Sequence, residues 1–281
     1  GVKVSVGQPY FNRMAIPVSL GLLLLIGIGP ALPWGRADNR NVRRALLFPI
    51  PAAIAGLLLT FVAGGRTWGV LATGALAAYA VWVNLDQGLR LSRKRREDEP
   101  WTEAVGEAVR RGARRYGAYF AHLGVIVTFV AIAVSSSYQT AQEGTLRPGE
   151  SMTVAGYKLT FERVEARPEP HRISDRARMR IEHNGKDAGT LEPALNRYDT
   201  RMEPIGTPAV RTAISHDLYL SLMNVGTDGS IGMRAIVTPA VVWIWIGVFI
   251  IVAGTAICLL PAGLRFSGRR PDAAAGAAAA A

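Results

Sequence analysis

The stretch RRYGAYFAHLGVIVTFVAIAV, residues 114–134, decides what kind of protein this chain is. Beyond Arg115 the run is predominantly apolar as far as Val134, close to the roughly 20 residues that a helix needs to cross a bilayer. His122 interrupts this apolar run. An ionisable side chain at membrane depth is costly and usually faces the interior of a helix bundle, where it binds or moves something. The stretch therefore predicts a transmembrane helix that carries one candidate functional side chain.

Other parts of the chain have a similar apolar character. With 116–134, five stretches are long and apolar enough, or nearly so, to span a bilayer, the others being 14–34, 45–64, 68–85 and 240–261. The third stretch is the weakest, because it is short and rich in alanine and glycine. We therefore predict an integral membrane α-helical bundle with about five transmembrane helices.

The formal net charge of +11 indicates how these helices are oriented. Residues 137–239 carry 13 Lys+Arg and 13 Asp+Glu, so the positive excess lies elsewhere, mainly in 35–44 and 86–115. Short cytoplasmic loops of membrane proteins carry such an excess, which explains the charge without a nucleic-acid partner. The N-terminus and residues 137–239 are then expected on the outer side of the membrane, and the C-terminus on the cytoplasmic side.

Residues 137–239 change character and predict a β-rich domain inserted before the last helix. Apolar and polar side chains alternate in 151–164 and again in 217–225 and 232–237, as in half-buried strands. Asn184-Gly185 is a strong short-range signal for a hairpin. The remaining segments are an inner region, 101–115, and a low-complexity tail, 262–281. The spacing in 101–115 fits either an amphipathic helix on the inner membrane surface or a plain connecting helix.

His122 has two chemical interpretations, which the residues alone do not separate. Desolvation favours a neutral imidazole, and neutral imidazole is a common ligand of haem iron. A histidine that packs across the bundle through a hydrogen bond would have the same sequence. Small residues on the same helix would let a flat ring or another helix approach closely; they are Gly117, Ala118, Ala121 and Gly124.

The other histidines have polar or turn-like surroundings. We expect no role for His171 and a solvated turn position for His183. Ser215-His216-Asp217 contains the residue types of a hydrolase triad, but a triad requires convergence in space, and no nucleophile or oxyanion-hole motif accompanies it. Cys258, the single cysteine, is expected to act as a small apolar side chain.

Five motifs, in order along the chain, resemble the C-terminal half of the CcmF family, the membrane haem lyase subunits of system I cytochrome c maturation. They are SVGQPYFN (5–12), GPALPW (29–34), YGAYFAHLG (116–124), DLY (217–219) and WIWIG (243–247). The resemblance extends to about Pro261 and includes the β-rich domain. It implies a haem-handling subunit in the bacterial inner membrane, with a periplasmic domain at 137–239 and a cytoplasmic C-terminus.

The resemblance also implies a specific role for His122, as one of two axial ligands of a resident haem b. The family's other haem ligands and its tryptophan-rich haem-handling loop have no counterpart in this sequence. We therefore expect this chain to be the C-terminal portion of a longer or split protein, and only part of a haem lyase.

The partners that the resemblance implies follow from the maturation reaction. They are the N-terminal half of the same protein or a split subunit, the membrane-anchored haem chaperone, apocytochrome c with its thiol-handling assembly subunits, and the lipid bilayer. The alternative from another class is a membrane transporter or scaffold subunit with a periplasmic interaction domain. In that case His122 serves as a packing or proton-relay residue.

Overall fold

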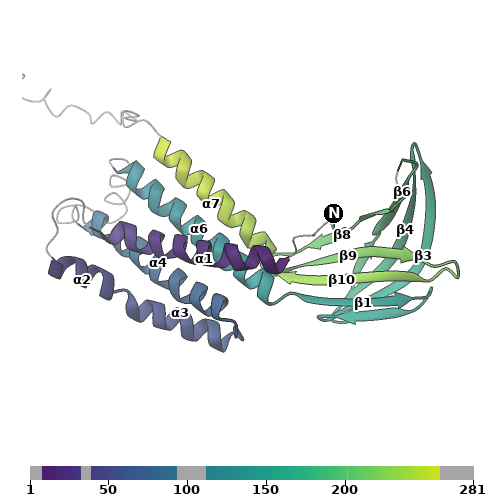
Figure 1. The fold of residues 1–281 in the computed structure, drawn as a ribbon, viewed down its shortest axis with the longest axis horizontal. Coiled ribbons are helices and arrows are strands. Elements are labelled where there is room, and N and C mark those ends of the chain that lie inside the picture. The colour runs from purple at the N-terminus through teal and green to yellow at the C-terminus, as the bar shows by residue number, and fades with distance from the viewer. Residues whose placement is uncertain (1–7, 33–38, 94–111, 201, 260–281) are drawn as a thin grey trace, which may run out of the picture.

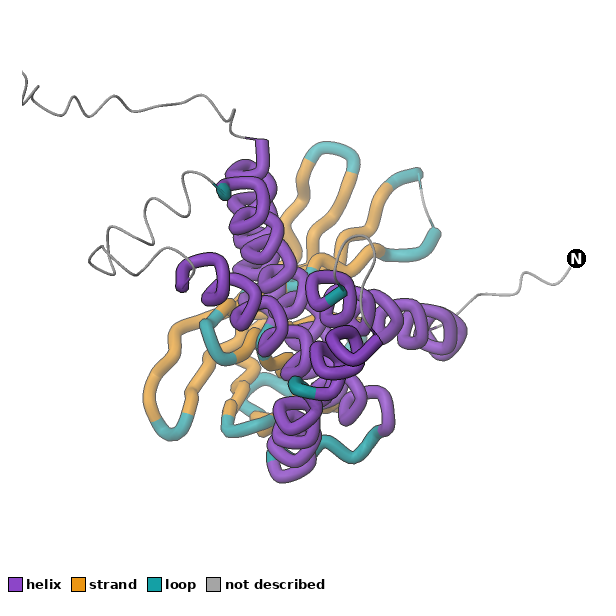
Figure 2. Tube along the Cα trace, turned by 90° about the vertical axis from the view of Figure 1, so that its left-hand side faces the viewer, coloured by secondary structure: helices purple, strands orange, loops and turns teal. Residues whose placement is uncertain are grey.

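The computed structural model describes residues 8–32, 39–93, 112–200 and 202–259. A helix bundle forms one part of the elongated molecule and a curled β-sandwich forms the other (Figure 1). Figure 2 looks from the helical end, with the helices in front of the strands. The expected architecture is confirmed: apolar helices, with a β-rich domain inserted before the last of them.

The bundle contains five helical stretches that are long and apolar enough to cross a membrane, counted among the described residues. Its elements are α1 (Gln8–Ile28), the short η1 (Gly29–Ala31), α2 (Asn39–Leu47), α3 (Ile50–Val62), α4 (Trp68–Arg93), α6 (Ala113–Ser137) and α7 (Val241–Leu259). One of the five stretches, Val42–Val62, includes most of α2 and all of α3.

Two helices differ from the lengths expected from the sequence. The expected span 45–64 is interrupted between α2 and α3, where Pro49 is the residue before α3. Proline has no N–H and its ring collides with the preceding turn, so a helix is broken there. The third span is longer than the expected 68–85, because α4 continues to Arg93. An ion pair of 2.7 Å between Asp86 and Arg90 joins successive turns of this extension.

Two predicted segments cannot be compared with the structure. Most of the expected inner-surface helix 101–115 lies outside the described residues, and the tail 262–281 lies outside them altogether. The last three residues of the former segment, 113–115, form the first turn of α6.

Helices α6 and α7 are in backbone contact through glycine. A Cβ atom on Gly117 would lie 2.6 Å from the carbonyl oxygen of Gly254, and one on Gly124 would lie 2.7 Å from that of Gly247. Separations this short leave no room for a side chain. Small residues at such positions allow close approach of membrane helices.

The β-sandwich consists of two antiparallel sheets. One sheet has the order β1-β10-β9-β8, and the other has β2-β3-β4-β6-β7, with β5 also paired to β4. The strands are β1 (Thr140–Leu146), β2 (Ser151–Val154), β3 (Tyr157–Glu169), β4 (Arg172–His183), β5 (Lys186–Leu191), β6 (Ala194–Tyr198), β7 (Ile205–Thr207), β8 (Ala209–Thr212), β9 (His216–Val225) and β10 (Ile231–Pro239).

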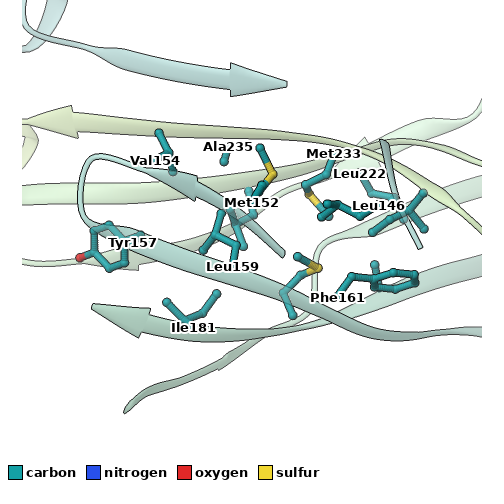
Figure 3. Close-up of a cluster of buried hydrophobic side chains, with 14 of the residues drawn as sticks. Leu146, Met152, Val154, Tyr157, Leu159, Phe161, Ile181, Leu222, Met233 and Ala235 are labelled. Atoms are coloured by element: carbon teal, nitrogen blue, oxygen red, sulfur yellow. The ribbon is translucent and has the colours of Figure 1, made fainter. Parts of the chain in front are cut away.

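Alternating side chains from both sheets form the core of the sandwich (Figure 3). Leu159 and Phe161 of β3 are fully buried, as are Leu218 and Leu220 of β9. The predicted hairpin is confirmed between β4 and β5, where Asn184 and Gly185 both have positive φ, 50° and 78°. Those values fit a type I′ turn, which favours Asn-Gly.

The sandwich is joined to the bundle through α6 and α7. Strand β1 follows α6 and pairs with β10, which precedes α7, in a register that sets Thr140 opposite Val237. At the second junction the Ala240 N–H donates a hydrogen bond of 3.1 Å to the Ser215 carbonyl. The sandwich is therefore connected to the two helices that touch through glycine.

Candidate functional site

His122 lies on α6, nearer the end that is distant from the sandwich. Nine positions separate it from Ala113, the first residue of the helix, which corresponds to about 14 Å along the axis. Its side chain is partly buried, and its Nδ1 atom lies 3.0 Å from Oδ1 of Asn84 on α4. The histidine therefore faces a polar group on a neighbouring helix rather than apolar side chains alone.

Asn84 connects three helices. Its side chain is only 2% exposed, although an amide is expensive to bury without partners. Its Nδ2 group donates to the Ala80 carbonyl one turn earlier in α4, at 2.8 Å, and is 3.4 Å from the Ile26 carbonyl of α1. With the His122 contact, the amide bonds to α1, α4 and α6.

These contacts determine which imidazole nitrogen carries the proton. Carbonyl oxygens only accept hydrogen bonds, so the Asn84 atom that faces Ala80 and Ile26 is the NH₂ group. The atom that faces His122 is then the amide oxygen, an acceptor, and Nδ1 of a neutral imidazole must donate to it. The Nε2 lone pair is left available, and Nε2 makes no hydrogen bond with any residue that the structure describes.

Neighbouring helices pack against both sides of α6 near His122. Gly117 and Gly124 are buried against α7, so the space beside them is filled by a helix and not by a flat ring. On the other side of α6, Ile126 joins an apolar cluster with Leu23 of α1 and Ala80 of α4. His122 is therefore held in a packed region of the bundle.

Cys258 and the basic residues at the start of α6 lie near each other. The Cys258 thiol lies 3.2 Å from the Arg114 carbonyl, at the contact between α7 and α6. Its half-buried position in the helix pair agrees with the expected packing role. The Arg114 and Arg115 side chains are exposed.

A second group of histidines lies in the sandwich, which the sequence did not reveal. His183 and His216 have ring centroids 5.6 Å apart, and Tyr157 packs against both, with centroids at 4.1 and 5.5 Å. Burial raises the pKa of Tyr157 above its ordinary value, while the charge of Arg211 acts in the opposite direction. Its hydroxyl therefore stays protonated at neutral pH.

The geometry around His216 does not form a hydrolase triad. Its Nε2 is bonded to the Tyr157 hydroxyl at 2.7 Å, and its Nδ1 to the Ser215 hydroxyl at 2.8 Å. Asp217 is buried and lies 3.5 Å from the Thr212 hydroxyl instead. His171 sits apart, in the turn between β3 and β4 with a φ of 67°. No cluster of three or more His, Cys, Asp or Glu suited to a metal ion occurs in the described part of the chain.

Sequence reasoning missed Asn84. It is the one amide side chain in the apolar stretch 68–85, and this could have identified it, because amides at membrane depth usually hydrogen-bond across helices. What the sequence could not give is the rotation of α4 that turns Asn84 toward His122.

Comparisons with known proteins show which proteins the chain is similar to in sequence and fold. Residues 137–239 match the family model described as the CcmF C-terminal beta-sandwich. The chain is similar in fold to a solved structure, "Cytochrome c Heme Lyase CcmF", with a TM-score of 0.73 and 28% identity, over 91% of this chain and 41% of that one.

Cytochrome c-type biogenesis proteins of two bacteria are similar in sequence to this chain over nearly its whole length. It is 28% identical over 263 residues to the cytochrome c-type biogenesis protein CcmF of Pseudomonas aeruginosa, covering 92% of this chain and 39% of the relative. It is 30% identical over 282 residues to the cytochrome c-type biogenesis protein ccl1 of Rhodobacter capsulatus, covering 98% and 40%. The chain thus spans about two fifths of the length of these relatives.

Proposed function

Because the chain is related over nearly its whole length to the C-terminal part of the CcmF family of cytochrome c-type biogenesis proteins, we propose that it handles haem in cytochrome c maturation. In this proposal His122 is an axial ligand of a haem b that resides in the membrane. The chain contributes to the transfer and covalent attachment of haem to apocytochrome c as one part of a larger haem lyase.

The observation that carries the proposal is the hydrogen bonding of the His122 ring, in which Nδ1 is bonded and Nε2 is not. A histidine that ligates a metal usually donates its other N–H to a fixed acceptor, which sets the tautomer and the ring orientation. Asn84 supplies such an acceptor at 3.0 Å from Nδ1, and Nε2 has no hydrogen-bond partner among the described residues. The residues present therefore fit an imidazole–iron bond through Nε2.

A haem b with two axial ligands supplies a one-electron centre. His122 provides one ligand, and we assign the second, together with the main haem-loading residues, to the remaining three fifths of the family's length. That part is carried either by the same polypeptide or by a separate subunit.

The proposed orientation follows from the charge distribution, and the proposed partners follow from the family resemblance. Arg90, Arg114 and Arg115 lie on α4 and α6 toward the ends away from the sandwich, as the positive-inside rule requires of the cytoplasmic side. We propose an inner-membrane protein with the sandwich in the periplasm and the C-terminus in the cytoplasm. The partners that the family resemblance implies are the haem chaperone, apocytochrome c and its thiol-handling subunits.

The test is optical and uses the fully assembled membrane complex. The purified complex should show a reducible b-type haem spectrum, and His122→Ala should remove or strongly weaken it while the protein still inserts. His171→Ala is the matched control, because it removes a histidine from a turn of the sandwich. It should leave the spectrum unchanged.

The same experiment can reject the ligand role. A full haem spectrum in His122→Ala would show that His122 packs the bundle or relays protons, as in a transporter or scaffold subunit. Addition of free imidazole to His122→Gly provides a second readout, because it should restore the spectrum only if the lost group was a ligand.

A further inference from the structure

We propose that Asn84 is the positioning residue of the haem site: it holds the Nδ1–H of His122 and thereby directs Nε2 toward the iron. The inference rests on the proposed function and assigns a role to a residue on a different helix from the ligand. It predicts that the amide tunes the electronic properties of the bound haem as well as the fold of the bundle.

The first step of the argument is burial. Asn84 is 2% exposed, and its neighbours Ala80 and Val83 on the same helix are buried apolar residues. An amide in such surroundings destabilises the protein unless its groups are bonded. All three of its recorded contacts are hydrogen bonds, and one of them is to the only histidine of the bundle's described residues.

The second step concerns orientation. An asparagine that made only one bond could turn its amide and offer NH₂ to the ring instead of oxygen. In this structure the NH₂ group is held by the carbonyls of Ala80 and Ile26, so Oδ1 cannot exchange places with it without losing those bonds. The acceptor that faces His122 is therefore fixed from two other positions in the bundle.

The third step is the nature of the acceptor. A neutral amide oxygen accepts a weaker hydrogen bond than a carboxylate does, because charge-assisted bonds are roughly twice as strong. A stronger acceptor at Nδ1 makes the imidazole a better donor to iron, which favours the ferric state and lowers the reduction potential. Asn84 therefore keeps the potential of the site higher than the histidine–carboxylate pairs found in many metal centres would.

The experiment compares matched variants in the assembled complex. Asn84→Asp replaces the amide by a carboxyl group of nearly the same shape, which keeps an oxygen facing Nδ1 but loses the NH₂ bonds to the Ala80 and Ile26 carbonyls. Asn84→Leu removes the acceptor. Thr73→Val is the control: Thr73 is a buried polar residue of the same helix, and its hydroxyl is bonded within α4 to the Gly69 carbonyl at 2.8 Å. The midpoint potential of the haem and the haem content per protein are measured for each.

We expect the midpoint potentials to rise in the order Asn84→Asp, wild type, Asn84→Leu, with Thr73→Val equal to wild type. Loss of the hydrogen-bond partner of a metal-bound histidine commonly weakens metal binding by about 10- to 100-fold. Asn84→Leu should therefore also bind haem more weakly and lose more of it when the complex is diluted. If Asn84→Leu does not assemble, the comparison of Asn84→Asp with wild type still decides the matter.

The outcomes separate this inference from the function on which it rests. Equal potentials in wild type and Asn84→Asp, with haem retained in both and lost in His122→Ala, would overturn the role of Asn84 and leave the ligand intact. Haem retained in His122→Ala would overturn both.

Discussion

The Tyr157 hydroxyl lies 2.7 Å from Nε2 of His216 and so joins the two sheets of the sandwich near α7, because His216 pairs with Pro239 just before that helix begins. Tyr157 begins β3 of one sheet, and His216 begins β9 of the other. The phenol ring closes one end of the apolar core, with its oxygen directed away from the other core side chains (Figure 3). The two sheets are thus bonded to each other where the sandwich meets the helix bundle.

Tyr157→Phe should lower the free energy of unfolding of the sandwich by about 1 kcal/mol. The substitution keeps the ring contacts with His183 and His216 but leaves Nε2 of His216 without its hydrogen-bond partner. Hydrogen exchange of β9 amides in the full chain measures the change. Tyr138→Phe is the control, because no hydrogen bond from the Tyr138 hydroxyl is recorded in the described structure. Equal protection in both variants would show that the bond adds no stability.

Gly124→Leu should separate α6 from α7 and destabilise the bundle. Its Cβ would lie 2.7 Å from both the Gly247 carbonyl oxygen and the Ile251 nitrogen, which are backbone atoms and cannot rotate away. Overpacking of this kind typically costs about 1–3 kcal/mol. Gly21→Ala is the matched control, because its Cβ would meet nothing within 4 Å. Thermal unfolding in detergent should give a lower midpoint for the first variant and an unchanged or higher midpoint for the second, because alanine favours a helix over glycine.

Acid should weaken the sandwich through Glu169. Its hydrogen bond from Arg172, assisted by Arg176, holds the pKa of Glu169 below its ordinary value of 4.5. The folded state therefore binds fewer protons than the unfolded state, and the stabilisation is present above about pH 4.5 and lost as the pH falls through the lowered pKa.

Glu169→Gln should remove this part of the acid sensitivity. Acid unfolding of the full chain, followed by the far-ultraviolet circular dichroism of the strands, should become less steep below the ordinary carboxyl pKa. Glu203→Gln provides the comparison, because Glu203 is exposed and makes no ion pair with any described residue. An identical acid profile for wild type and Glu169→Gln would contradict the prediction.

Phe161→Ala should disrupt the sandwich while the helices still insert. Phe161 is fully buried, and truncation of a buried phenylalanine costs about 3–5 kcal/mol. Limited proteolysis of membrane-embedded protein should cut within 137–239 in this variant and not in Val210→Ala, whose side chain is 48% exposed. Resistance of Phe161→Ala to cleavage would show that the core tolerates the cavity.

Much of the fold could be predicted from the sequence, because two of its determinants are local. The length of an apolar run, set against the thickness of a bilayer, predicts a transmembrane helix. The Asn184-Gly185 pair predicts a tight hairpin turn, because both residues tolerate the positive φ that this turn requires. Strands β7 and β8 could not be predicted in this way. They are short and mostly exposed, so they lack the alternation that reveals a half-buried strand.

The candidate site was predictable only in part. His122 stands out as an imidazole within an apolar run, but its partner Asn84 is 38 positions away, on a helix whose rotation depends on packing. The approach of His183 to His216 likewise depends on how one sheet lies over the other. Such pairings are set by tertiary structure, and no spacing within one segment encodes them.

The backbone contact of α6 with α7 also fixes the depth of His122. Gly117 faces Gly254 and Gly124 faces Gly247, while beyond the bundle the strands that continue these helices are held in register by the pairing of Thr140 with Val237. Neither helix can slide along the other without breaking both sets of contacts. His122 is therefore kept about 22 Å, the length of fifteen helical residues, from the Ser137 end of α6. In the membrane orientation that we propose, the periplasmic domain therefore helps to fix the depth of His122 in the bilayer.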